Sequence, residues 1–403
     1  MSVTTVDIAA AARTIAGQVV ETPLLPSATL SEMAGTELLL KLENLQLTGS
    51  FKARGALNKL TGLAASTTGV VACSAGNHAQ GVACFAARLG FPATIVMPSG
   101  TPFLKVERTE AYGAKVVLEG ETLAESAEFT RALAEREGHE FIHPYDDPLI
   151  IAGECTVATE MLAAAPDLVA IVVPIGGGGL ISGIAVAAKA HNPDIQIVGV
   201  EAELYPSMSQ ALAGAAPTSG GTTLAEGIAV KNPGSLTRPI VEELVDEIVL
   251  LDEAAIESAV ELMAEAAHLV VEGAGATALG AVLARPNLFS GRKTGLVVSG
   301  GNIDMRLLAT VLLRGLVRGG QLMRLRVQIT DAPGHLARVG RIIGDAGGNV
   351  VDIVHQRMFY NVPVKQADLD VVVETRNAAH GTEILRALTA AGLPTRELDD
   401  SDA

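Results

Sequence analysis

The sequence predicts an α/β protein whose larger part is built on parallel strands covered by helices, followed by a small C-terminal domain. Three observations lead to this prediction. Short β-branched runs alternate with Ala-rich helical stretches over the first 320 residues, these runs are apolar throughout, and the pattern changes near Gly319 and Gly320. Strands that are apolar on both faces lie between two helical layers. We therefore expect a doubly wound α/β unit, or two, ahead of a separate domain.

The larger part contains seven apolar runs that we predict to be strands, with helices between them. One predicted helix is HAQGVACFAARLG (78–90), another ends near Tyr112, and a third runs through Arg136. The strands are GVVACS (69–74), ATIVMP (93–98), AKVVLEG (114–120), DLVAIVVPI (167–175), IQIVGVEAE (195–203), DEIVLLD (246–252) and TGLVVSGGN (294–302).

The C-terminal segment has a different pattern, because its first predicted strand, LMRLRVQIT (322–330), alternates between apolar and polar residues. A turn and helix follow in residues 331–347, and two strands follow in NVVDIVHQRM (349–358) and ADLDVVVET (367–375). A second helix is predicted at GTEILRALTAAG (381–392). The order β-α-β-β-α, with room for a short last strand, is the ferredoxin-like arrangement.

Composition limits the possible functions. The net charge of -16 disfavours a nucleic-acid partner, which would require clustered Lys and Arg. We find neither a secretory leader nor an apolar run long enough to span a membrane, so we expect a cytoplasmic protein without a membrane partner. Cys73, Cys84 and Cys155 show no disulfide or metal-ligand spacing, and we expect them to be core residues.

Lys52 lies in SFKARGA (50–56), beside Phe51 and ahead of an apolar helical run. Most lysines are solvated on the surface, and this interpretation fits any single lysine. The alternative is covalent chemistry, for which the amine must be neutral. We expect burial beside Phe51 and near other cationic groups to favour the neutral amine.

The segment CSAGNHAQG (73–81) follows a predicted strand and opens a predicted helix. Ligands of open parallel sheets bind beyond the carboxyl ends of strands, and helix N-termini favour anions. We predict that the backbone amides of Ser74, Gly76 and Asn77 bind an anion such as a carboxylate. Ordinary cap and turn roles for Asn77 and His78 remain an alternative.

The segment PIGGGGLISG (174–183) also joins a strand to a helix. Four consecutive glycines lose much backbone entropy on folding, so we expect a ligand to approach the backbone closely there. The spacing misses the dinucleotide fingerprint at Ser182, and Ile184 stands where a P-loop would have lysine. We predict a cup for a single phosphate, with a ligand-free glycine turn as the alternative.

A third loop, VVSGGN (297–302), ends the last strand of the larger part. Ser299 either caps the next segment of the chain or presents a neutral hydroxyl to a ring nitrogen of a ligand.

These four segments occur in the order found in the fold-type II pyridoxal-phosphate enzymes, and the chain most closely resembles the threonine and serine dehydratases over about residues 10–318. The resemblance implies a catalytic domain at 1–320 with parallel-rich sheets, in which a smaller subdomain at about 45–150 is inserted. It implies pyridoxal 5'-phosphate as cofactor. It also implies a lyase that converts L-threonine, and L-serine, into 2-oxobutanoate or pyruvate and ammonia.

The resemblance also implies roles for single residues. Lys52 would form the Schiff base with the cofactor and move the Cα proton, Asn77 would bind the 3-hydroxyl, and Ser299 would face the pyridine nitrogen. The implied cofactor-binding residues are Phe51, Lys52, Asn77, Gly176, Gly177, Gly178, Gly179, Leu180 and Ser299. The residues implied for the substrate carboxylate are Ser74, Ala75, Gly76, Asn77 and His78.

Four further positions are compared with those of relatives. Serine racemases carry a second base at the position of Ala75, and a methyl group carries no proton. Those relatives also hold a divalent ion through a Glu and an Asp six residues later, where this chain has Glu201 and Ser207. We expect no such metal site and leave a monovalent cation open. Glu272 resembles an acid near the cofactor ring, but an ordinary helix-start glutamate fits as well.

Residues 321–403 resemble an ACT-type regulatory domain through DAPGHL (331–336) and GGNVVDI (347–353). The resemblance implies an amino-acid effector such as isoleucine or valine, feedback in isoleucine biosynthesis, and a homodimer or homotetramer. The implied effector residues are Pro333, Gly334, His335, Leu336 and Asn349. Three alternatives remain: a catabolic dehydratase, a degenerate domain that serves only oligomer contacts, and a non-catalytic amino-acid sensor.

Overall fold

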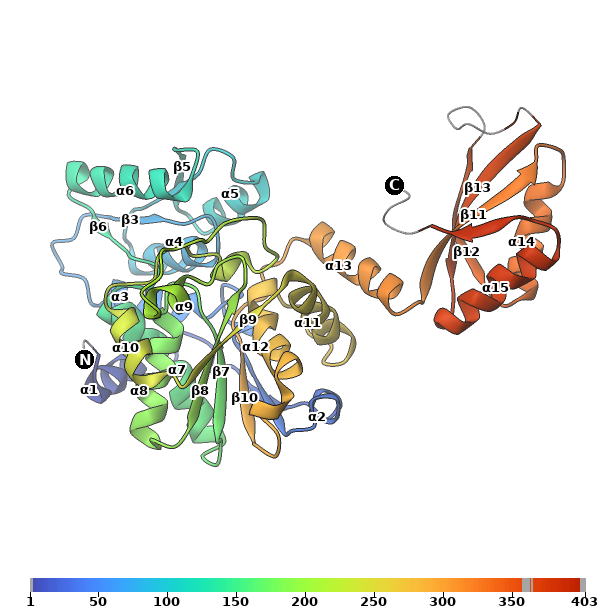
Figure 1. The fold of residues 1–403 in the computed structure, drawn as a ribbon. Coiled ribbons are helices and arrows are strands. Elements are labelled where there is room, and N and C mark those ends of the chain that lie inside the picture. The colour runs from blue at the N-terminus through green and yellow to red at the C-terminus, as the bar shows by residue number, and fades with distance from the viewer. Residues whose placement is uncertain (1–2, 357–362, 364, 399–403) are drawn as a thin grey trace. The chain divides into compact units, whose positions relative to one another are not determined.

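The computed structural model describes residues 3–356, 363 and 365–398, and it divides the chain into two compact units at Ile303 and Asp304. The larger unit contains two sheets and the C-terminal unit one (Figure 1). Each unit has its own hydrophobic core. The division falls before helix α13 (Met305–Arg318), whereas the change of sequence pattern falls after it. The periodicity of this amphipathic helix resembles that of the preceding helices, so pattern alone did not separate it from them.

The larger unit contains a six-stranded sheet in the order β1-β2-β10-β7-β8-β9, in which only the edge strand β1 is antiparallel. The central strands are fully buried, as expected for strands between helical layers. The bounds are β1 Leu24–Pro26, β2 Leu38–Leu42, β7 Ala170–Pro174, β8 Gln196–Ala202, β9 Glu247–Leu251 and β10 Thr294–Val298.

A second sheet of four parallel strands, in the order β5-β4-β3-β6, is formed by the chain between β2 and β7. It lies above the larger sheet in Figure 1, with α5 and α6 beside it. The bounds are β3 Val70–Cys73, β4 Ala93–Met97, β5 Lys115–Leu118 and β6 Glu140–Phe141. The α/β architecture with parallel-rich sheets is thus as predicted.

Helices connect the strands of both sheets. Those of the larger unit are α1 Thr5–Ile15, α2 Ala28–Ala34, α3 Lys52–Thr61, α4 Asn77–Leu89, α5 Phe103–Glu110, α6 Leu123–Glu137, α7 Pro148–Ala164, α8 Gly179–His191, α9 Ser207–Leu212, α10 Thr237–Leu244, α11 Glu253–Glu265 and α12 Gly273–Ala284, with 3-10 turns η1 Glu43–Leu45, η2 Glu226–Ile228 and η3 Pro286–Leu288. Cys73, Cys84 and Cys155 are free and buried, as predicted. None of the described helices is long and apolar enough to cross a membrane.

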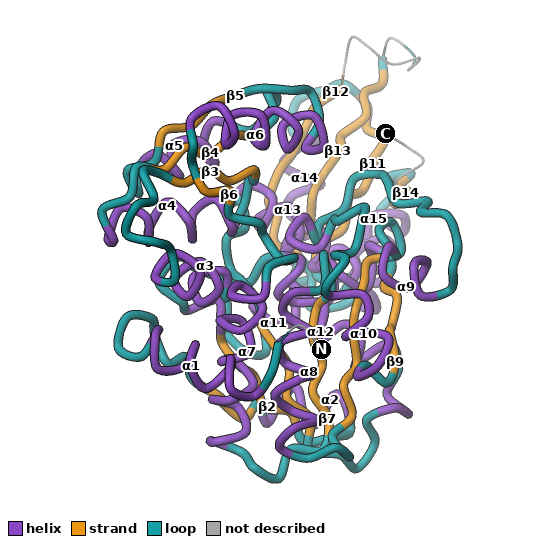
Figure 2. The backbone as a smooth tube through the Cα atoms, turned by 90° about the vertical axis from the view of Figure 1, so that its left-hand side faces the viewer, coloured by secondary structure: helices purple, strands orange, loops and turns teal. Residues whose placement is uncertain are grey.

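Helices α3 and α7 lie next to each other (Figure 2) and approach closely because each has a glycine at the crossing. A Cβ atom on Gly153 would lie 2.6 Å from the carbonyl oxygen of Arg54, and one on Gly55 would lie 3.0 Å from the carbonyl oxygen of Ile150. Larger residues at either glycine would push the helices apart. This contact sets the position of the N-terminal turn of α3, which carries Lys52.

The C-terminal unit has an antiparallel sheet in the order β12-β13-β11-β14, with α14 and α15 packed on its apolar face. Its element order β-α-β-β-α-β is the predicted one, and the short last strand is present. The bounds are β11 Leu322–Thr330, α14 His335–Asp345, β12 Asn349–Gln356, β13 Gln366–Glu374, α15 Ala378–Ala390 and β14 Thr395–Glu397. Residues 357 and 358, predicted to end the second strand, lie outside the described residues.

Candidate functional site

The three predicted loops follow parallel strands, and hydrogen bonds join two of them, at 73–81 and 297–302, to each other and to the segment around Lys52. The amide of Phe51 donates to the carbonyl oxygen of Ser299 at 3.1 Å. The side-chain amide of Asn302 donates to Thr48 O and to Asn77 Oδ1, each at 2.8 Å. The segments containing Lys52, Asn77 and Ser299 therefore meet at one place in the larger unit.

Lys52 is the first residue of α3, and its side chain is 15% exposed. Its Nζ donates to the carbonyl oxygen of Pro144 at 2.6 Å and to Glu154 Oε1 at 3.0 Å. The Phe51 ring centroid lies 4.6 Å from the same nitrogen. Lys52 is thus held inside the unit and is not a solvated surface lysine.

The charged group in contact with Lys52 differs from our expectation of cationic neighbours. It is the carboxylate of Glu154, which is fully buried on α7. Burial raises the pKa of Glu154, although the positive charge of Lys52 opposes the shift. The other oxygen, Oε2, is buried and has no hydrogen-bond partner. Sequence patterns centred on loops missed this residue, but a carboxylate inside the apolar helix PLIIAGECTVATEMLAA was an available signal.

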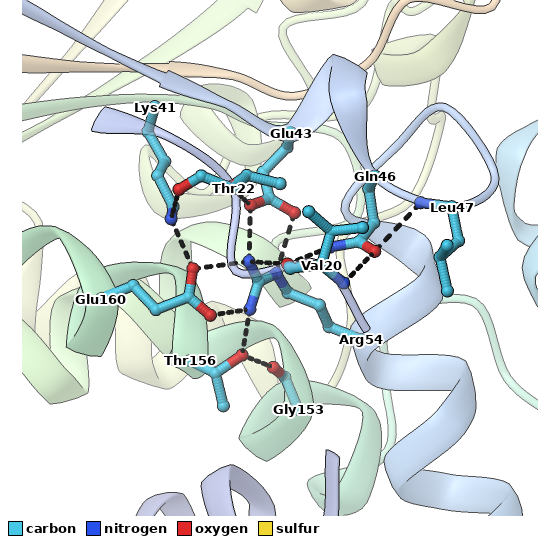
Figure 3. A network of polar contacts seen from close by, with 10 residues as sticks. All are labelled: Val20, Thr22, Lys41, Glu43, Gln46, Leu47, Arg54, Gly153, Thr156 and Glu160. Carbon is cyan, nitrogen blue, oxygen red and sulfur yellow. Dashed lines mark hydrogen bonds and ion pairs between the residues drawn. The ribbon is translucent and has the colours of Figure 1, made fainter. Parts of the chain in front are cut away.

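A buried ionic network holds the helix of Lys52 in place (Figure 3). Arg54 is 0% exposed and forms hydrogen bonds to both oxygens of Glu43 at 2.8 Å and to Glu160 at 2.5 and 2.7 Å. Lys41 also pairs with Glu160 and donates to Thr22 O at 2.7 Å. Burial alone would lower the pKa of Arg54, but the carboxylates raise it overall. The network fixes α3 against α7 and the end of β2.

Four consecutive glycines, Gly176–Gly179, form a glycine tetrad between β7 and the first turn of α8. Gly178 has a φ of 95°. A Cβ on Gly177 would lie 2.3 Å from the Tyr145 ring, and one on Gly179 would lie 2.6 Å from Glu154 Oε2. Part of the need for glycine thus comes from protein neighbours. The Glu154 carboxylate also joins the tetrad to Lys52. Leu180 is buried in the core.

The residues at the tetrad fit a bound phosphate. The first N–H groups of α8 have no partner inside the helix, and the absence of side chains leaves them accessible to an anion. Lys52 offers an amine near this end of the site, while Asn77 and Ser299 supply neutral polar groups. This donor set suits pyridoxal phosphate, which combines an aldehyde, a phosphate and a polar ring.

Asn77 forms hydrogen bonds with two other side chains, those of Glu272 and Asn302. Its Nδ2 donates to Glu272 Oε1 at 2.7 Å, and its Oδ1 accepts from Asn302. Burial raises the pKa of Glu272 to about 7, although the hydrogen bond from Asn77 opposes the shift. Glu272 precedes α12 but makes no side-chain capping bond, so the helix-start interpretation does not describe its carboxylate.

The loop predicted to bind a carboxylate offers fewer groups than expected. The amide of Ser74 donates to Val96 O in the sheet, and the amide of Gly76 donates to Ser74 Oγ at 3.2 Å. Both amides are therefore engaged, contrary to our expectation. The Ser74 hydroxyl and the backbone N–H groups of Ala75 and Asn77 remain for an anion.

The His78 side chain is also unavailable to a substrate carboxylate. It is 4% exposed, and its Nε2 lies 3.0 Å from the carbonyl oxygen of Ile142. Burial lowers the pKa of His78 to about 3, so the ring is neutral at neutral pH. A neutral ring that donates from Nε2 has only an acceptor at Nδ1, which cannot bind a carboxylate. Only the backbone N–H of His78 is suited to that role.

Ser299 lies directly after β10 and is 3% exposed. A Cβ on the next residue, Gly300, would lie 2.4 Å from Glu272 Oε1 and 3.2 Å from Asn77 Nδ2. The strand end is therefore packed against the Asn77–Glu272 pair. Tyr145 and Asn302, which our sequence reasoning did not select, complete the surroundings through their contacts with Gly177 and Asn77.

The Glu201 carboxylate is occupied by the N-terminus of α9. It accepts from the amides of Met208 and Ser209 at 2.7 and 3.0 Å and from Ser209 Oγ at 2.6 Å. Within the described residues, no group of three or more His, Cys, Asp or Glu side chains could hold a metal ion. The monovalent cation stays a prediction.

The predicted effector residues do not meet within one C-terminal unit. Pro333, Gly334 and Leu336 are exposed and His335 is half-buried at the start of α14, beyond the end of β11. Asn349 pairs with Glu374 of β13, which also pairs with Leu322, the first residue of β11. Asn349 therefore lies at the other end of the sheet. A nine-residue strand separates the two ends by roughly 26 Å. One small molecule cannot contact both within a single copy.

Comparison with known proteins gives consistent results. The family model described as "Pyridoxal-phosphate dependent enzyme" matches residues 15–300. The chain is 43% identical to an L-threonine ammonia-lyase of Thermotoga maritima over 398 residues, which cover 98% of this chain and 99% of that protein. A threonine deaminase from T.th. has a similar structure, with a TM-score of 0.72 and 42% identity over 75% of this chain and 99% of that one. A pyridoxal 5'-phosphate-dependent aspartate racemase is also similar, with a TM-score of 0.73 and 34% identity over 76% of this chain and 98% of that one.

Proposed function

Because the chain belongs to the pyridoxal-phosphate dependent enzyme family, we propose that it is a threonine ammonia-lyase, which converts L-threonine into 2-oxobutanoate and ammonia. The observation that carries this function is the likeness to an L-threonine ammonia-lyase along 98% of the chain. The buried amine of Lys52 beside the glycine tetrad supports it. L-Serine, which differs by one methyl group, is the second substrate and yields pyruvate.

When bound, pyridoxal phosphate supplies the electron sink that makes the Cα proton of the substrate removable. Lys52 would hold the cofactor covalently, and its free amine would take the Cα proton of the substrate. The first N–H groups of α8, freed by Gly176–Gly179, bind the phosphate. Phe51 and Leu180 line the cofactor site.

Two neutral groups complete the cofactor site. Asn77, oriented by Asn302, would donate to the 3-hydroxyl of the cofactor, and Ser299 would face its ring nitrogen. A serine at that nitrogen does not enforce its protonation, which weakens the electron sink and favours prompt loss of the β-hydroxyl.

The substrate carboxylate binds at the N-terminus of α4. The Ser74 hydroxyl and the backbone N–H groups of Ala75, Asn77 and His78 are the donors, because the amides of Ser74 and Gly76 are engaged. Holding the carboxylate aligns the Cα–H bond with Lys52. The methyl group of Ala75 cannot deliver a proton from the opposite face, which favours elimination over the racemase activity named for one structural relative.

The C-terminal unit acts as an ACT-type regulatory domain that binds isoleucine or valine and adjusts catalysis by feedback. Its β-α-β-β-α-β order and antiparallel sheet support this role, as does the likeness to the Thermotoga enzyme, which extends into this unit. The effector binds at Pro333–Leu336 without Asn349 of the same copy. The enzyme works as a homo-oligomer and supplies 2-oxobutanoate for isoleucine synthesis.

Release of 2-oxo acid from L-threonine and L-serine by the purified, cofactor-loaded protein tests the activity. We expect turnover of both, and the absence of turnover for both would refute the proposal. Repeating the assay with isoleucine and valine tests the regulatory role, which unchanged rates with both would exclude. A non-catalytic sensor would bind these amino acids and release no oxo acid.

A further inference from the structure

A second titratable group touches the amine that carries the proposed chemistry. Glu154 lies in the buried part of α7 among apolar residues such as Ile151 and Cys155, and its side chain is 0% exposed. A carboxylate in such surroundings is costly unless it is paired. Its environment therefore requires a partner that can supply either a positive charge or a proton.

That partner is Lys52. Nζ lies 3.0 Å from Glu154 Oε1, and within the described residues no other cation forms an ion pair with Glu154. Arg54, two residues after Lys52 on α3, is occupied by Glu43 and Glu160. The two carboxylates of α7, Glu154 and Glu160, thus pair with different cations, and only Glu154 contacts Lys52.

The second oxygen of Glu154 is turned toward the proposed cofactor site. Oε2 has no hydrogen-bond partner and lies where a Cβ on Gly179 would be 2.6 Å away. The carboxylate therefore bridges Lys52 and the glycine tetrad. A group placed only to stabilise the helix contact would have no reason to leave a buried oxygen unsatisfied at this point.

We propose that Glu154 is the proton partner of Lys52, an inference that rests on the proposed role of this lysine. Before Nζ can bond to a carbonyl carbon, it must lose one proton. The N–H bond breaks, its electron pair stays on Nζ, and an O–H bond forms at Glu154 Oε1. The pair changes from ammonium and carboxylate to amine and carboxylic acid without a change of net charge.

This exchange suits a buried site because no ion has to be left uncompensated. Burial raises the pKa of Glu154 and so makes its carboxylate a better proton acceptor.

The test is the rate at which cofactor-free full-length protein captures pyridoxal phosphate, followed through the visible absorbance band from about pH 6 to pH 10. Three variants are compared with the wild type at each pH: Glu154→Gln, Glu154→Asp and Glu160→Gln. The ratio of rates removes the titration of the cofactor itself. Glu160→Gln is the matched control. It removes a carboxylate from the same helix, but that carboxylate pairs with Arg54 and not with Lys52.

Internal proton transfer needs no exchange with solvent, so capture by the wild type levels off toward low pH. The rate of capture by Glu154→Gln keeps falling as the pH is lowered. Below the pH at which half of the Lys52 amine is protonated in this variant, the ratio of the wild-type rate to the variant rate rises about tenfold for each unit by which the pH is lowered. Glu154→Asp, whose carboxylate is one methylene further from Nζ, levels off at a lower rate. The ratio for Glu160→Gln stays constant with pH.

A ratio for Glu154→Gln that is independent of pH overturns the inference, as does a wild-type rate that falls as steeply as that of the variant. Circular dichroism of each cofactor-free variant establishes that it is folded before its rate is used. A wild type that forms no band at any pH would instead contradict the proposed function. The two failures are therefore distinguishable.

Discussion

Glu272→Gln should stabilise the cofactor-free protein at alkaline pH and have little effect at acid pH. The carboxyl group of Glu272 is buried and has a pKa of about 7 in the folded chain, against an ordinary value of 4.5. Between these values the unfolded chain ionises and the folded chain does not. The folded state therefore loses stability as the pH rises from about 4.5 to about 7, and the loss persists above this range.

The size of the effect follows from the shift. At 1.36 kcal/mol per pKa unit, the loss is about 3 kcal/mol at pH 8 and below about 1 kcal/mol at pH 5. Glutamine cannot ionise and still offers an oxygen to Asn77 Nδ2. For a unit of this size the variant should melt about 5 °C higher than the wild type at pH 8 and about 1 °C higher at pH 5.

Thermal melting of both proteins without cofactor, across this pH range, is the assay. Glu203→Gln, at an exposed position, is the control and should leave the melting temperature unchanged at both pH values. Equal differences between Glu272→Gln and wild type at pH 5 and pH 8 would show that Glu272 is ionised throughout. That result would refute the assignment of a buried, neutral acid beside Asn77.

Two further substitutions test the scaffold of the site. Arg54→Met leaves the buried carboxylate of Glu43 without its cation and should reduce the free energy of unfolding by about 3–5 kcal/mol in urea denaturation, whereas Arg136→Met, in an exposed pair, should change it by less than about 1 kcal/mol; similar losses would contradict the role of the network. Gly177→Ala places a methyl group 2.3 Å from the Tyr145 ring and should weaken cofactor binding in an absorbance titration at least tenfold, while Gly340→Ala, which meets no atom within 4 Å in α14, should not; unchanged affinity of Gly177→Ala would show that the tetrad tolerates side chains.

The large-scale architecture was predictable because its signals are local. Strands buried on both faces are apolar throughout, as in β7 and β10, and glycine-rich segments stand out wherever a strand meets a helix. The order of the Lys52 segment and the three glycine-rich loops along the chain led to the right family. The C-terminal sheet followed from the change to alternating polarity in β11.

The features that the sequence did not reveal depend on contacts between distant segments. The pairing of Lys52 with Glu154 joins residues far apart in the chain through a helix crossing at Gly55 and Gly153, which no periodicity encodes. The hydrogen bond from the amide of Ser74 to Val96 O likewise joins segments that are distant in the chain.

The separation of the effector residues has the same origin. Asn349 follows closely in sequence on the turn at Pro333–Leu336, yet α14 carries the chain back along the sheet between them. Sequence proximity was therefore a poor guide to shared binding. The register of β11, β12 and β13 decides which residues lie at the same end.

Covalent attachment at Lys52 is the claim on which the rest depends, and peptide mapping tests it most directly. The cofactor-loaded protein is reduced with borohydride, digested and analysed by mass spectrometry. We expect a pyridoxyl modification on the peptide that contains Lys52 and its loss in Lys52→Ala. A modification carried instead by Lys59, or none on a protein that releases oxo acid from threonine, would contradict it.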